Sequence, residues 1–247
     1  MRLLITSCFL FLLTSLSAQV EVNNGGWFGG GDRVEGNGEV VNDDRDLDDF
    51  TGVKACCSFK VELAEGAFAV RVEAESNLQE FIETEVRSGV LHIKYTDNAN
   101  FKSTEPIRVY VTLPRLERID GSSSSEIVGT TPFTGEDLEV DVSSSATIEV
   151  QFTGDRVELD ASSSGKIVVK GSAKRVVADA SSASRIDAGA LEADEAVADV
   201  SSAANVEVYA RKSLRADASS AGSVRYGGNP TDIDTDASSA GRVRSKN

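Results

Sequence analysis

The residues with the clearest chemical potential are aspartates and serines that return at a regular spacing. Each aspartate is followed two and three positions later by a Ser-Ser pair, and the seven aspartates are Asp120, Asp141, Asp160, Asp179, Asp199, Asp217 and Asp236. Hard cations prefer several oxygen ligands, so stacked carboxylates and serine oxygens could form a row of weak calcium sites. The favoured alternative is that each aspartate caps its own corner, accepting hydrogen bonds from the Ser-Ser pair that follows.

Catalytic arrangements are not indicated. The sole histidine, His92, lies in the middle of an expected strand, so a Ser-His-Asp relay is not expected. Enzymes that act on polysaccharides with a β-helix have clefts walled by long loops, but these repeats vary only between 18 and 21 residues. We therefore expect a non-catalytic protein without catalytic residues or cofactors, and a polysaccharide-active enzyme is the less favoured alternative.

Two adjacent cysteines, Cys56 and Cys57, are the cysteines that remain after an expected signal peptide is removed. They are too few for a disulfide framework, and a metal site would need more ligands. Adjacent cysteines can close a vicinal ring, but in a strand they point to opposite faces. We expect one to be buried and the other exposed, and assign them no chemistry.

The repeat itself predicts the fold, because a fixed period of about 20 residues is typical of a solenoid. Seven residues after each aspartate stands a β-branched aliphatic residue, and this column comprises Ile127, Ile148, Ile167, Ile186, Val206, Val224 and Val243. Counted from the aspartate, odd positions are apolar or small and even positions are polar, so odd positions should face inward. Each repeat should hold two strands and a serine-rich corner.

An antiparallel series of hairpins could show the same alternation. Such hairpins should carry recurring Asn-Gly or Asp-Gly turns, yet the repeats contain a single one, Asp120-Gly121. The sequence therefore predicts an all-β protein, a parallel β-helix of about seven coils. Stacking would place neighbouring aspartates about 4.8 Å apart, where two charges repel by roughly 3 to 4 kcal/mol at an effective dielectric near 20.

The chain before the repeats divides into three expected parts. Residues 1–18 resemble a secretory signal peptide, with Arg2 before an apolar core, and residues 19–47 form a flexible, glycine-rich lead-in. A single β-helical domain should span residues 48–247, with an N-terminal β region at 48–119 and the repeats at 120–247. In the N-terminal region, residues 59–63 and 68–72 are expected to form one hairpin, and residues 83–86 and 91–95 another, capping the solenoid.

The N-terminal succession also carries a family resemblance. The segments Phe50-Thr51-Gly52-Val53, Asn77-Leu78-Gln79-Glu80-Phe81-Ile82 and Val109-Tyr110-Val111-Thr112-Leu113-Pro114 follow one another as in the DUF2807 family. This family comprises the auto-transporter adhesin "head GIN" domains of Bacteroidetes, and the chain resembles it over roughly residues 36–245. The resemblance implies a β-helical domain of an exported protein and brings no catalytic residue.

The formal charge of −15 becomes about −16 without Arg2, which argues against nucleic acid or an anionic membrane as partner. We expect an exported binding or adhesion module, periplasmic, secreted or at the cell surface, that presents a regular acidic and serine-rich face to a cell-surface glycan or protein. The alternative is a passive structural spacer of the envelope. No apolar run is long enough to span a bilayer as a helix.

Overall fold

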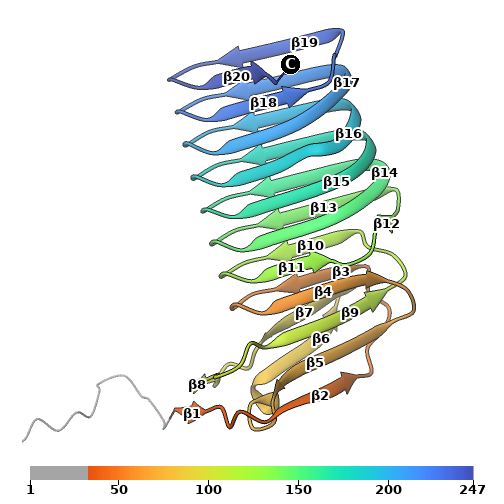
Figure 1. The fold of residues 1–247 in the computed structure, drawn as a ribbon, viewed down its shortest axis with the longest axis vertical. Coiled ribbons are helices and arrows are strands. Elements are labelled where there is room, and N and C mark those ends of the chain that lie inside the picture. The colour runs from red at the N-terminus through yellow and green to blue at the C-terminus, as the bar shows by residue number, and fades with distance from the viewer. Residues whose placement is uncertain (1–32, 247) are drawn as a thin grey trace, which may run out of the picture. The chain divides into compact units, whose positions relative to one another are not determined.

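The computed structural model describes residues 33–246, and the expected signal peptide and residues 19–32 of the lead-in lie outside them. The predicted parallel β-helix is confirmed: the strands stack coil upon coil along one axis (Figure 1). The strands of the stack after residue 117 are β10 (Arg118–Gly121), β11 (Glu126–Gly129), β12 (Phe133–Thr134), β13 (Asp137–Val142), β14 (Thr147–Ala161), β15 (Lys166–Ala180), β16 (Arg185–Val200), β17 (Asn205–Ala218), β18 (Ser223–Gly227), β19 (Asp232–Ala237) and β20 (Arg242–Ser245).

Each coil is built from two strand segments that meet at the serine-rich corner. Strands β14 to β17 run through the opposite, smooth bend, so each of them carries the second segment of one coil and the first segment of the next. Every strand from β10 to β20 pairs in parallel with the equivalent strand one coil away, as in β14 with β15 from Thr147↔Lys166 to Ala161↔Ala180. Backbone hydrogen bonds therefore run along the solenoid axis and hold coil to coil.

The predicted aliphatic column runs through the core of the solenoid. Its seven members are in register across successive coils, and all are almost fully buried except Val243, which is partly buried. The inward assignment of odd positions holds along the strands, where Val142 and Ala146 are buried. It fails at the corner, where Ser144 is exposed, because the backbone there leaves the extended conformation and alternation stops.

One further coil with the corner of the repeat precedes the aspartate repeats. Strands β3 (Gly52–Ala55) and β4 (Lys60–Glu65) pair in parallel with β10 and β11, placing Lys54 in register with Asp120 and Val61 with Ile127. The predicted hairpin of residues 59–63 and 68–72 is therefore wrong. Its first strand belongs to a coil, and its second strand, β5 (Ala69–Glu75), pairs antiparallel with β9 (Arg108–Leu113).

A smaller set of strands covers that first coil. It comprises β1 (Val34–Glu35), β2 (Val40–Arg45), β5, the 3₁₀ turn η1 (Gln79–Phe81), β6 (Ile82–Arg87), β7 (Val90–Tyr95), β8 (Phe101–Lys102) and β9. Strands β7 and β9 continue the parallel stack below β3 and β4. The predicted hairpin of β6 and β7 is confirmed, and β2 pairs antiparallel with β5, so antiparallel strands close this end as expected.

One buried carboxylate ties the cap together. Glu75, fully buried, accepts hydrogen bonds from the backbone N–H of Gly38 (2.8 Å) and from the N–H and hydroxyl of Thr104 (2.9 and 2.6 Å). The Ser103 hydroxyl lies 2.8 Å from the same group. Although burial alone would raise the pKa of Glu75, these hydrogen bonds lower it to about 2. The connection between β1 and β2 and the connection between β8 and β9 are thus both hydrogen-bonded to one charged side chain.

Candidate binding groove

Each serine-rich corner is a tight turn with two left-handed residues. The third and fourth residues after the aspartate have φ near +50° and +63° in every coil, as at Ser163 (48°) and Ser164 (63°). The carbonyl before them accepts a hydrogen bond from the N–H after them, as from Gly165 to Ser162 (2.8 Å). Two positive φ values and this bond define a type I′ turn, which usually takes Asn-Gly. Here Ser-Ser or Ser-Ala adopts it.

Stacking explains how residues with side chains tolerate this strained backbone. The N–H of the second left-handed residue donates to the carbonyl of the first one in the next coil, as from Ser164 to Ser182 (3.1 Å). The same bond recurs from Ser58 in the first coil to Ala221 near the far end. A left-handed residue other than glycine costs roughly 1 to 2 kcal/mol, and surrounding structure must hold it in place. The corner hydrogen bonds fix this geometry in each coil.

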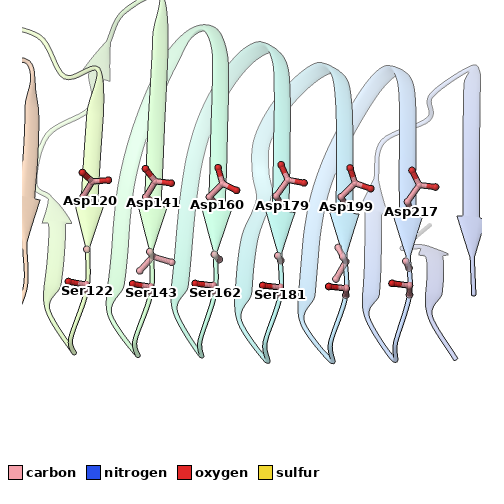
Figure 2. A pocket seen from close by; sticks show the side chains of 18 of the residues that line it. Asp120, Ser122, Asp141, Ser143, Asp160, Ser162, Asp179, Ser181, Asp199 and Asp217 are labelled. Carbon is pink, nitrogen blue, oxygen red and sulfur yellow. The ribbon is translucent and has the colours of Figure 1, made fainter. Parts of the chain in front are cut away.

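The regular corners place the aspartates and serines along one groove. The seven aspartates are in register from Asp120 to Asp236, and the first serine of each pair lies beside them. Figure 2 shows the carboxylates as one row and the serine hydroxyls as a second, parallel row. The groove has a volume of about 860 Å³ and is floored by the small or branched residue that follows each aspartate, such as Ala161 or Val200.

Cations gather at one end of the groove. Arg118 contacts Asp120 (3.1 Å), Asp141 (2.6 Å) and Glu139 (2.7 Å), and Lys54 lies 3.8 Å from Asp120. Partial burial alone would raise the pKa of Asp120, but the hydrogen bonds from Arg118 and Asp141 and the nearby positive charges lower it. Positive side chains therefore compensate the aspartates at the end of the row near the cap, and the negative charge of the row increases farther along.

The neighbouring aspartates hold protons more tightly. Burial, the hydrogen bond to Asp120 and the charge of Asp120 together raise the pKa of Asp141 to about 7. Burial and neighbouring carboxylates also raise the pKa of Asp160 and of Asp179. Two carboxylates held this close share a proton, as like charges disfavour a second ionisation. The repulsion expected from stacking is thus relieved by a proton and by Arg118 at this end, while Asp217 is 42% exposed to water.

The expected corner caps are not formed. Within residues 33–246 no aspartate of the row accepts a hydrogen bond from the Ser-Ser pair after it, and Asp236 accepts from the N–H of its neighbour Ala237 (2.9 Å). The turn is instead closed by its own backbone, which leaves the carboxylates facing the groove. No group of three or more His, Cys, Asp or Glu side chains in the described part of the chain is arranged around a common point for a metal ion. The calcium row stays a prediction.

The prediction for the cysteines is wrong. Cys56 and Cys57 form a disulfide with each other and are both partly exposed, since Cys57 has φ of 61° and lies in a corner rather than in a strand. They occupy the Ser-Ser positions of the first coil, beside Lys54 at the end of the groove. A signal was present: Lys54-Ala55-Cys56-Cys57-Ser58 has the spacing of the repeat, with Lys54 in place of aspartate. The pattern Asp-x-Ser-Ser does not include this coil, and it gives no indication of Arg118.

His92 lies in the same column, one strand beyond Lys54, and faces Glu85 across the β6–β7 pair. Burial is the first cause that lowers the pKa of His92, and the charges of Lys54 and Arg87 act in the same direction. Burial and these charges therefore favour the neutral imidazole. His92 therefore continues the column of Lys54 and the aspartates by one more residue. Its neighbours on the adjacent strands are Lys54 and Glu85, and neither is a serine that could form a catalytic pair with it.

The coils, cap and groove define a parallel β-solenoid with one long polar groove. The family model described as "Putative auto-transporter adhesin, head GIN domain" (DUF2807) matches residues 49–230, and the chain belongs to this family. No curated protein matches the chain.

Solved structures agree on the fold. A "putative adhesin" from Bacteroides fragilis is similar with a TM-score of 0.81 and 16% identity, covering 86% of this chain and 99% of that one. A "putative adhesin" from Parabacteroides merdae has a TM-score of 0.73 and 18% identity over 88% of this chain and 100% of that one. A "putative lipid binding protein" from Parabacteroides distasonis gives 0.74 and 19%, over 87% and 100%. At these identities the likeness concerns the fold.

Proposed function

We propose that this chain is an exported, non-catalytic binding module whose groove takes a neutral glycan of a cell surface. The observation that carries the proposal is the continuous groove itself, in which each of the seven aspartate-containing coils contributes one carboxylate and one serine hydroxyl at the same place. The family and the solved neighbours, which are described as adhesins or as a lipid-binding protein, support a binding role over a catalytic one.

The donor set fits sugar hydroxyl groups. A carboxylate can accept two hydrogen bonds from neighbouring hydroxyls, and a serine hydroxyl can both donate and accept. Coils repeat at about 4.8 Å, so an extended chain of sugars would meet the same pair of groups at short, regular intervals. Each contact would be weak, and affinity would accumulate along the groove, as in multivalent binding.

Charge favours neutral over acidic glycans. The full chain has a formal net charge of −15. Part of this negative charge is the row of aspartates in the groove, where Lys54 and Arg118 are confined to one end. An acidic polysaccharide would meet like charge along most of the groove, and opposing like charges across an interface cost several kcal/mol. The same field would not oppose a neutral chain.

The test is a screen of the mature chain, from residue 19, against neutral and acidic polysaccharides, followed by titration calorimetry of any hit. We expect binding to a neutral glycan without release of products. Asp179→Asn with Ser181→Ala, in the middle of the groove, should weaken binding at least about tenfold, whereas Asp187→Asn, exposed on the other strand of the coil, should leave it unchanged.

Other outcomes would contradict this function. Binding that both variants reduce equally would place the ligand elsewhere, and binding to proteins alone would exclude the glycan. Absence of any ligand would favour the spacer role, and turnover abolished by a single substitution would show an enzyme.

A further inference from the structure

The end of the solenoid opposite the cap has exposed strand edges. Strand β19 pairs with β17 and strand β20 with β18, and within residues 33–246 neither strand has a partner on its other side. Ile233, an inward residue of β19, is 48% exposed, and Val243 is less buried than the other members of its column. Backbone groups and core side chains of the last coil are therefore open to a further strand layer.

The two edge strands carry opposite charges on their outer faces. Strand β19 presents Asp232, Asp234 and Asp236, and strand β20 with the residue after it presents Arg242, Arg244 and Lys246, all of them exposed. The ion pairs at this end, Arg215 with Asp217 and Lys246 with Glu207, leave the other five without an ionic partner among the described residues. Charges of one sign protect a single edge from pairing, but an acidic edge beside a basic edge is complementary to itself.

We propose that this end binds a second copy of the chain, forming a twofold dimer in which β19 of each copy pairs with β20 of the other. Rotation by 180° about an axis along the strands exchanges the two sides of the coil, so the acidic edge of one copy lies on the basic edge of its partner. The direction of β19 toward the corner and of β20 away from it makes both new pairings antiparallel. The interface is isologous and contains each contact twice.

The symmetry stops the assembly at two copies. The twofold contact uses the edges of β19 and β20 in both copies. The other end of the stack is built differently, since β2, β5 and β6 pair antiparallel there. In the dimer Asp236, Asp234 and Asp232 face Arg242, Arg244 and Lys246 of the partner in that order, and Ile233 and Val243 lose their exposure. The inference depends on the edge strands and not on the proposed glycan.

Charge reversal of one pair gives a decisive test. The mature chain should sediment as a dimer in analytical ultracentrifugation at low salt, with a dissociation constant that rises with ionic strength. Asp234→Arg and Arg244→Glu should each raise that constant at least about tenfold, since each homodimer then contains two like-charged contacts. An equimolar mixture of the two variants should dimerise again, because the heterodimer restores an opposite charge at both contacts.

Recovery by mixing separates this arrangement from simple damage to the last coil, because neither misfolded variant could rescue the other. Lys166→Glu, an exposed reversal in mid-solenoid, serves as the control and should leave the constant unchanged. A chain that stays monomeric at every concentration would overturn the proposal. A dimer that ignores both reversals, or is lost when residues 19–32 are removed, would also overturn it.

Discussion

At the scale of the residue, the important feature is the unequal protonation of chemically identical aspartates. Asp120 lies between Lys54 and Arg118, while Asp141 is next to the charge of Asp120 and holds its proton to a pKa of about 7. A carboxyl group whose pKa is raised on folding stabilises the native state fully below its unfolded pKa near 4, and this contribution is lost as the pH rises through about 7. The groove therefore becomes both more negative and less stable above neutrality.

Asp141→Asn tests this protonation. An amide cannot ionise, and its oxygen still accepts the hydrogen bond from Arg118. At pH 8 the free energy of unfolding of the variant should therefore exceed that of the wild type by about 1 kcal/mol or more. At pH 3 the two should be nearly equal, because Asp141 is then protonated in both the folded and the unfolded chain. Denaturant melts at the two pH values give the comparison, with Asp187→Asn as control. Equal loss of stability at both pH values would show that Asp141 acts through its ion pair instead.

The positions of individual residues could be predicted from the sequence wherever the repeat period determines them. The aspartate and aliphatic columns could be predicted since one period repeats seven times. The hydrogen bonds of the aspartates could not, because a type I′ corner made from Ser-Ser lacks the Asn-Gly signature and closes through its own backbone. Cys56 and Cys57 were misjudged for the same reason, as a strand was assumed where the chain turns.

At the scale of the element, alternation along the strands decides what each position tolerates. Ile167 is fully buried in the column between Ile148 and Ile186, whereas Lys166, one residue earlier, is exposed. Sequence predicted this difference, as side chains of a strand alternate between faces. Glu75 lay beyond such reasoning, because its partners Gly38 and Thr104 are brought together by the cap rather than by any period.

Two substitutions at adjacent positions measure the alternation. Ile167→Lys should abolish cooperative melting, because an unpaired buried charge costs more than the whole stability of a typical domain can offset. Lys166→Glu should shift the midpoint little, as surface substitutions usually stay within about 0.5 kcal/mol. Circular dichroism during heating is sufficient. Similar effects from both would contradict the assignment of faces.

At the scale of the whole molecule, the coils behave as interchangeable units. Strands β14 and β15 pair over their common length without a register shift, at a separation of 19 residues. Each coil contacts its two neighbours, so stability should be close to a sum of coil and interface contributions. The structure allows a coil to be removed as long as the period is respected.

Deletion of residues 162–180 joins Ala161 to Ser181 and removes one whole coil. The shortened chain should still melt cooperatively, with a moderately lower midpoint, because every remaining column stays in register. Deletion of residues 162–179 instead leaves one residue too many and reverses the faces beyond the junction, so it should fail to fold. Thermal melts and sedimentation of both chains decide the matter, and equal behaviour would contradict a modular stack.

The parallel stacking also bears on how the chain reaches its structure. Most β proteins fold slowly, because their strands pair with partners far along the chain. Here each strand after β10 finds its partner about one coil later, and the cap supplies a formed edge from which pairing can begin. Folding can therefore advance as a zipper, one coil at a time, from the cap toward β20. Each added coil lengthens the groove by one aspartate and one serine, so the length of the groove reports how many coils have folded.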